Sequence, residues 1–188
     1  MLILELGIKL DKDFKYYDNL LKSKGLINDF KVMTHDIYYT NKNLDNLSEN
    51  EMKNACIRLR SFDNVIYYIQ NNPIDDLNMK EVSSDRLKEF ENRLIEFGYK
   101  KVFDTTKKDF HYYKIGMTSK VQLQQIDKIG LLVYFDNKDY YEFDFKTQRK
   151  MLIDELNSYG FDFDYNTLGL DKLRTLYYGK EMYSKNQN

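Results

Sequence analysis

The sequence lacks several features that would narrow its function class. Cys56 is its single cysteine, so an internal disulfide is excluded and a reducing compartment is favoured. No apolar run approaches the roughly 20 residues that a membrane-spanning helix needs, and the first residues show no signal-peptide pattern. We therefore expect a cytoplasmic protein with no membrane partner.

The sequence also has no excess of positive or negative charge. The chain has 29 basic and 30 acidic residues, and its formal net charge is −1. Such a chain has no overall positive field to attract nucleic acid, so nucleic acid is not expected as a partner. Zinc-finger spacings, nucleophile elbows and glycine-rich phosphate loops are absent as well. Any site for an anion must therefore come from a local cluster of basic side chains.

The length and the apolar content are ordinary for a globular protein. The chain has 188 residues, of which 42% are hydrophobic and 31% are charged. One domain is the expectation for this size, with enough apolar side chains to bury a core. We predict a single domain over residues 1–183, followed by a frayed tail at 184–188.

Several segments alternate apolar and charged residues, which is typical of half-buried strands. The opening segment 2–10 places leucine and isoleucine on one face and Glu5, Gly7 and Lys9 on the other. "ACIRLRSF" places Arg58 and Arg60 side by side, and "YYEFDF" does the same with Glu142 and Asp144. In an open sheet such charged faces would contact water, whereas in a closed sheet they would line a polar tunnel. The pattern alone does not choose between the two.

The remaining elements follow from periodicity and from turn residues. Further strands are expected at 31–40, 64–73, 100–106, 109–116, 120–126 and 129–136. Amphipathic helices are expected from about 11 or 13 to 24, from 83 or 84 to 97, at 147–159 and at 168–178. The acids before residue 147 would also suit a helix start, where the helix dipole favours negative charge. The pattern is that of an α+β fold, with many strands and three to four flanking helices.

Four short motifs occur in order along the chain. They are "ELGIK" in the first strand, "DIYY" at Asp36, Tyr38 and Tyr39, "ACIRLR" before and within the arginine strand, and "EFDF" before the 147–159 helix. Their order and spacing resemble the CYTH superfamily of triphosphate tunnel metalloenzymes. That superfamily includes class IV adenylate cyclases, thiamine triphosphatases and inorganic tripolyphosphatases. The resemblance covers nearly the whole chain, although each motif alone is weak.

The resemblance implies a closed or nearly closed antiparallel β-barrel with a charged tunnel. Its phosphate-binding residues would be Lys9, Arg58, Arg60 and Lys107, and its metal ligands Glu5, Glu142 and Asp144. Arginine forks grip phosphate oxygens in pairs, and carboxylates suit Mg²⁺ (or Mn²⁺). The ligand would be a nucleotide or an inorganic polyphosphate. The reaction would be metal-dependent triphosphate hydrolysis by water or, second, adenylate cyclisation. No catalytic residue is assigned, and a homodimer is left open.

Three positions depart from the family pattern. Gly7 replaces the second acid of the first motif, Asn71 replaces a lysine before a glycine-proline pair, and Asp109 stands where an arginine is expected. The alternative is therefore a non-catalytic CYTH-like module, which senses or sequesters a smaller nucleotide or binds a protein partner. In that reading Asp109 pairs with Arg60 or Lys9. Under either reading, Asp36 and Tyr38 are expected to be strand and barrel-wall residues and not catalysts.

Overall fold

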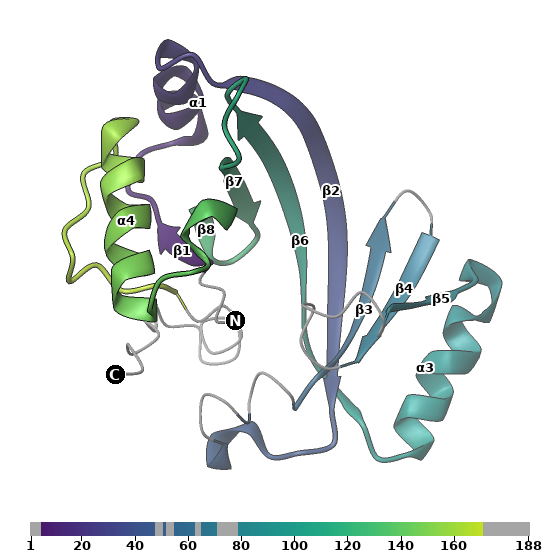
Figure 1. The fold of residues 1–188 in the computed structure, drawn as a ribbon. Helices are drawn as coiled ribbons and strands as arrows, with labels where there is room; N and C mark the ends of the chain where they lie inside the picture. Colours follow the sequence, from purple (N-terminus) through teal and green to yellow (C-terminus); the bar gives the residue numbers. More distant parts are fainter. Residues whose placement is uncertain (1–4, 48–50, 52–54, 63–64, 71–78, 171–188) are drawn as a thin grey trace. The chain divides into compact units, whose positions relative to one another are not determined.

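The computed structural model describes residues 5–47, 51, 55–62, 65–70 and 79–170. Its strands are β1 (Leu6–Lys9), β2 (Ile27–Thr40), β3 (Ile57–Phe62), β4 (Val65–Gln70), β5 (Met79–Val82), β6 (Lys100–Tyr113), β7 (Lys120–Ile126) and β8 (Gly130–Asp136) (Figure 1). Its α-helices are α1 (Phe14–Ser23), α3 (Leu87–Glu96) and α4 (Phe145–Ser158). Short 3-10 helices are η1 (Leu44–Asn46), η3 (Ser84–Arg86) and η4 (Lys138–Tyr140). None of the described helices is long and apolar enough to cross a membrane.

The strands form one sheet in the order β1-β8-β7-β6-β2-β3-β4-β5. The ladders β1–β8, β7–β8, β2–β3, β3–β4 and β4–β5 are antiparallel. The two longest strands, β2 and β6, are neighbours at the middle of this order and run side by side in Figure 1. The predicted α+β class with an antiparallel sheet is confirmed. In the described residues no ladder joins β1 to β5, so hydrogen bonding does not close the sheet.

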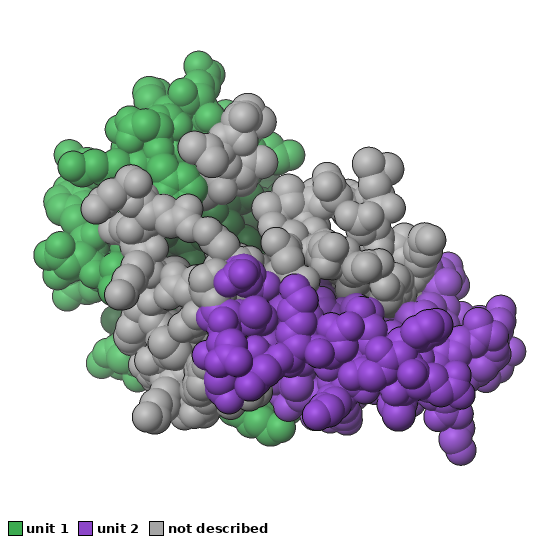
Figure 2. Space-filling view, turned by 90° about the horizontal axis from the view of Figure 1, so that it is seen from below, with its two compact units in different colours: residues 1–32, 108–171, 181–188 green, residues 33–107, 172–180 purple. Residues whose placement is uncertain are grey.

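The chain divides into two compact units, which Figure 2 distinguishes by colour. Unit 1 comprises residues 1–32, 108–171 and 181–188, and unit 2 comprises 33–107 and 172–180. The single domain over residues 1–183 stays a prediction.

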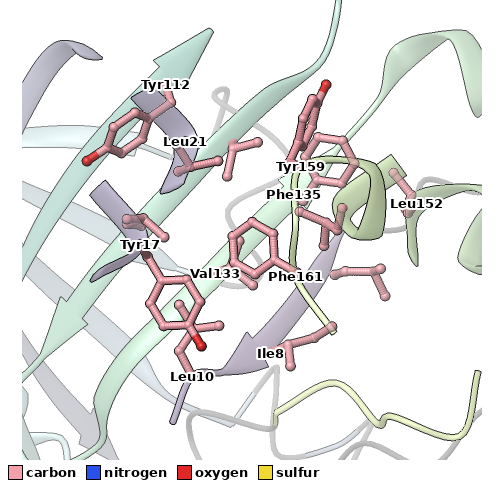
Figure 3. Close-up of a cluster of buried hydrophobic side chains, with 14 of the residues drawn as sticks. Ile8, Leu10, Tyr17, Leu21, Tyr112, Val133, Phe135, Leu152, Tyr159 and Phe161 are labelled. Carbon is pink, nitrogen blue, oxygen red and sulfur yellow. The ribbon is translucent and has the colours of Figure 1, made fainter. Parts of the chain in front are cut away.

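The core of unit 1 confirms the alternation of the opening segment. Leu6 and Ile8 of β1 are each 2% exposed and pack with side chains of β7, β8, α1 and α4 (Figure 3). Helix α1 begins after Asp13, whose side chain accepts a hydrogen bond from the Tyr16 amide. It is followed by Gly25 at φ +81°, a conformation that glycine adopts without strain. The predicted helix and its glycine stop are therefore both present.

In unit 2 one face of β2 and β3 is apolar. Tyr39, Ile57 and Leu59 are buried together with Leu94 of α3. The Tyr39 hydroxyl also donates a 2.6 Å hydrogen bond to Glu91 of this helix. Because successive strand residues point to opposite faces, the residues between them form the other face of the same two strands. That second face carries the candidate site.

Three expectations for the elements need correction. Residues 100–113 form one continuous strand, where two strands with a break were predicted. Strand β5 was not predicted, because its four residues "MKEV" are too few to show a period. Residues 141–144 form no strand: they are turn and bend residues between η4 and α4. A period of two over so few residues fits a turn as well as a strand. Most of the expected 168–178 helix lies outside the described residues.

Candidate functional site

The register of β2 and β3 brings basic and acidic side chains together. In the antiparallel ladder Asp36 lies opposite Arg60, and Tyr38 lies opposite Arg58. Residues directly opposite one another in such a ladder point to the same face of the sheet. Four polar side chains therefore occupy the face turned away from the buried Ile57 and Leu59. The D-x-Y and R-x-R motifs thus form one structural unit.

Asp36 is the centre of this group. It is 0% exposed, and its carboxylate accepts hydrogen bonds from Arg60 Nε at 2.7 Å and Arg60 Nη2 at 2.9 Å. Lys107 Nζ on β6 lies 2.8 Å from Asp36 Oδ2, and Arg58 Nη1 lies 3.9 Å from the same oxygen. The Tyr38 hydroxyl donates a longer bond of 3.4 Å to it. We call Asp36, Arg58, Arg60, Lys107 and Tyr38 the cation cluster.

The electrostatics of the cation cluster keep Asp36 ionised. Burial by itself would raise the pKa of Asp36, but the hydrogen bonds from Arg60 and the charges of Lys107, Arg60 and Arg58 outweigh it, so the pKa lies well below its usual value. Burial, followed by the charge of Asp36, raises the pKa of Tyr38 to about 12. Tyr38 is therefore a neutral hydroxyl at ordinary pH.

Lys107 is under opposing influences. Burial lowers its pKa, Asp36 raises it, and the neighbouring Arg60 lowers it again, with a net shift downward. A lysine in this position is held by one carboxylate while two guanidinium groups repel it. An additional anion would relieve that repulsion.

Arg58 is the member of the cluster with unused hydrogen-bond donors. Its Nε and Nη2 atoms are buried and have no hydrogen-bond partner. Its side chain is 14% exposed, so water reaches only a small part of it. Buried donors that lack a partner are costly, and they are rare in native structures unless a ligand or an ion fills the place. This guanidinium group is therefore the chemically notable feature of the site.

The structure brings three of the predicted phosphate-binding residues together. Arg58, Arg60 and Lys107 all contact Asp36 within unit 2. Asp36 was assigned only to the strand wall, so its place at the centre of the cluster was missed. The signal was present in the sequence: an acid and a tyrosine two residues apart match two arginines two residues apart.

The other predicted site residues belong to unit 1. Lys9 is half-buried at the end of β1, and Glu5, Glu142 and Asp144 are exposed. Glu5 helps to raise the pKa of Tyr141 to about 12, after burial and a hydrogen bond to Asp136, so it lies near the segment before α4. Their roles toward a ligand stay predictions.

Among the described residues, the predicted metal ligands Glu5, Glu142 and Asp144 form no preassembled group. No three His, Cys, Asp or Glu side chains in the described part of the chain lie close enough to hold an ion together. Asp144 accepts hydrogen bonds from the Thr147 amide at 3.0 Å and the Thr147 hydroxyl at 2.6 Å, which is how an acid caps a helix. Magnesium binding stays a prediction, and no chemical step is derived from it.

Gly7 stands where the family pattern has an acid, and it also has a packing role. It pairs with Tyr134 of β8, and a Cβ atom at Gly7 would lie 2.7 Å from Tyr134 Cζ and 2.8 Å from the Tyr134 hydroxyl. The aromatic ring therefore occupies the space into which an acid at this position would project. The second carboxylate of the family motif is replaced by a tyrosine from the neighbouring strand.

Two further departures from the family pattern have different outcomes. Asp109 is 9% exposed and its Oδ1 has no hydrogen-bond partner, whereas Arg60 is held by Asp36. Asp109 belongs to unit 1 and Arg60 to unit 2, so the suggested pairing of Asp109 with Arg60 or Lys9 stays a prediction. Asn71 lies outside the described residues.

Comparison with solved structures supports the fold. No family model and no curated protein matches the sequence. Among solved structures, PH1819 of Pyrococcus horikoshii OT3 is similar at 17% identity and a TM-score of 0.59, covering 92% of this chain and 94% of that one. HpAC1 of Hippeastrum, a proposed adenylyl cyclase with a dominant triphosphatase activity, is similar at 11% identity and a TM-score of 0.59, covering 95% and 97%.

A third similar structure is a proposed adenylate cyclase of Vibrio parahaemolyticus. It shares 15% identity with this chain at a TM-score of 0.51, covering 83% of this chain and 87% of that one. At these identities the likeness concerns the fold. The resemblance that the four sequence motifs predicted is confirmed at that level, and the chain has the fold of CYTH-type proteins.

Proposed function

We propose that this protein binds a phosphate-rich anion, a nucleotide or an inorganic polyphosphate, through the cation cluster. The observation that carries the proposal is the guanidinium group of Arg58, whose buried Nε and Nη2 atoms have no partner. Arginine binds phosphate oxygens in pairs, and a partly buried arginine binds them more strongly than an exposed one. The two neighbouring cations, Arg60 and Lys107, add positive potential.

The geometry favours a binding module over a metal-dependent enzyme. A triphosphatase or an adenylate cyclase of this type needs carboxylates that hold a metal ion against the phosphates. Here Tyr134 fills the space at Gly7, and Asp144 caps α4. A non-catalytic CYTH-like module that senses or sequesters a nucleotide is therefore the first form of the proposal.

Metal-dependent triphosphate hydrolysis is the second form, and adenylate cyclisation is its variant. The similarity in fold to HpAC1, with its dominant triphosphatase activity, supports this form. Glu5, Glu142 and Asp144 would hold Mg²⁺ or Mn²⁺, which would neutralise negative charge on the phosphates. Arg58, Arg60, Lys107 and Lys9 would hold the phosphates.

We also propose that the sheet forms a closed or nearly closed barrel, as the fold family implies. If the charged strand faces line one tunnel, Lys9 of β1 contacts the same ligand as Arg58 of β3. Lys9→Ala and Arg58→Ala should then each weaken binding, and the double variant should show a coupling between them. Equal affinity of Lys9→Ala and the natural protein would contradict a shared tunnel.

The experiment is a panel of ATP, GTP, thiamine triphosphate and tripolyphosphate, each with EDTA, Mg²⁺ or Mn²⁺. Isothermal titration measures binding, and product analysis detects released phosphate, pyrophosphate or cyclic nucleotide. Arg58→Ala should abolish binding, while Arg93→Ala, an exposed arginine of α3, should not change it. AMP and ADP are added to the panel for the non-catalytic form. If neither these nor any of the four triphosphates binds to the folded protein under any condition, the proposal is wrong.

A further inference from the structure

Arg149 is a charged residue at a core position of unit 1. Helix α4 buries a stripe of side chains, in which Leu152, Ile153 and Leu156 belong to the hydrophobic core, and Figure 3 shows Leu152 in that cluster. Arg149 lies three, four and seven residues before these three, so it shares their face of the helix. Its residue is 8% exposed. The chain therefore has a guanidinium group where the helical period predicts an apolar side chain.

The guanidinium group of Arg149 is buried with unused donors. Its Nε and Nη2 atoms have no hydrogen-bond partner. Burial lowers the pKa of Arg149, and among the described residues no neighbouring charge opposes this effect. An arginine nonetheless stays protonated in proteins, and a buried charge without a partner is costly. A native arrangement of this kind calls for an anion at the guanidinium group.

The arginines of unit 2 near α3 show what Arg149 lacks. Arg86 and Arg93 lie three and four residues from Glu89 and form ion pairs with it, at 3.3 Å and 2.6 Å. The positions three and four residues away from Arg149 hold phenylalanine, lysine, leucine and isoleucine. Helix α4 thus supplies no acid at the spacings at which helical side chains meet.

We propose that Arg149 binds the carboxylate group of a small monocarboxylic acid, at a site separate from the cation cluster. Nε and Nη2 form one edge of the guanidinium group, and each donates to one oxygen of the carboxylate. One carboxylate balances the single positive charge, whereas a phosphate dianion would leave a negative charge buried. The ligand is a small molecule, because so little of Arg149 is exposed.

The surroundings of Arg149 favour an acid with an apolar body. The stripe that continues from it along α4 is apolar, through Leu152 and Ile153. The two lysines of the same helix segment, Lys146 and Lys150, are exposed, and the ammonium group of Lys150 lies 5.5 Å from the centroid of the Tyr165 ring. Neither lysine belongs to the buried stripe, so a single negative charge is the better match for the site.

The test is an NMR titration of the full natural chain, labelled with ¹⁵N, that follows the arginine Nε–H signals. Acetate, butyrate, orthophosphate and chloride are added separately at constant ionic strength. We expect acetate and butyrate to shift the Arg149 signal, with butyrate binding more tightly, and orthophosphate and chloride to shift it at least tenfold less at the same concentration. The signal is assigned by its absence from the spectra of Arg149→Met and Arg149→Lys.

Stability gives a second readout. Methionine has a similar reach and no charge, so Arg149→Met should raise the midpoint of urea unfolding in a buffer that contains chloride as its anion. Added butyrate should raise the midpoint of the natural protein and not that of Arg149→Met. The matched control Arg93→Met, which replaces an exposed arginine, should keep the butyrate response. If Arg149→Met does not fold, Arg149→Lys keeps the charge without the paired donors and should lose most of the response.

Three outcomes would overturn the proposal. The first is an Arg149 signal that neither acetate nor butyrate shifts, and the second is an equal shift with chloride. The third is binding of an aspartate-containing peptide without any binding of the small acids, which would make the occupant a protein. The Arg149 shift should persist in Arg58→Ala, and its loss there would show that the carboxylate acts at the cation cluster instead.

Discussion

Arg60 donates two hydrogen bonds to the fully buried Asp36, from Nε to Oδ1 at 2.7 Å and from Nη2 to Oδ2 at 2.9 Å. The two residues lie opposite each other on β2 and β3. A carboxylate held in this way fixes the orientation of one arginine and leaves its neighbour, Arg58, facing the same side with unused donors. The pair thus links the stability of the strand ladder to the properties of the candidate site.

Replacing Asp36 should destabilise the protein and increase its response to anions. Asp36→Asn removes a fully buried carboxylate that contacts all three cations. Breaking a buried ion pair costs about 3–5 kcal/mol, so urea unfolding at pH 7 in a buffer without phosphate or sulfate should show a loss of that order. Added sulfate should then raise the stability of Asp36→Asn more than that of the natural protein. A variant whose stability is unchanged would show that the cluster has no structural role.

The pH dependence of this loss follows from the lowered pKa of Asp36. A carboxyl group whose pKa is lower in the folded than in the unfolded state stabilises the fold above the unfolded value of about 3.9. That contribution is lost as the pH falls through the folded pKa. The difference in unfolding free energy between the natural protein and Asp36→Asn should therefore be constant from pH 7 to 5 and shrink below about pH 4.

Asp162→Asn provides the matched control for both experiments, because Asp162 is an exposed aspartate outside the cluster. It should change stability by less than about 0.5 kcal/mol. A difference for Asp36→Asn that already shrinks near pH 6 would mean that its pKa is raised and that the cations do not hold it.

Gly7 and Tyr134 should be coupled. Gly7→Ala places a Cβ atom 2.7 Å from Tyr134 Cζ, so the ring must move. We expect a cost of about 1–3 kcal/mol, as for other overpacked sites. In a Tyr134→Val background the same change should cost less by at least about 0.5 kcal/mol, measured by urea unfolding of the four proteins. Additive costs would mean that Gly7 is required for another reason.

Asp144 should behave as a helix cap. Asp144→Ala removes the acceptor of the Thr147 amide and should lower stability by about 1 kcal/mol. Asp144→Ser keeps a capping oxygen and should retain most of the stability. Thermal unfolding in EDTA measures both, since no divalent ion contributes there. Equal losses for the two variants would contradict a capping role.

The sequence alone determined the elements whose side chains repeat with a clear period. Leu6 and Ile8 alternate with polar residues and became the buried face of β1, and Gly25 marked the end of α1. Periodicity failed where the segment was too short, as in β5 and residues 141–144. The order of the motifs, and not any one of them, predicted the CYTH-type fold.

The tertiary structure decided which charges meet. The sequence placed Arg58 next to Arg60, but the ladder register with β2 put Asp36 opposite Arg60, and Lys107 came from a strand distant in the sequence. Likewise, only the pairing of β1 with β8 showed that Tyr134 fills the space at Gly7. Spacing along one strand determines which side chains point to the same face, because the side-chain period is two. The contacts of a side chain on that face depend on the register between strands, which pairs residues far apart in the chain.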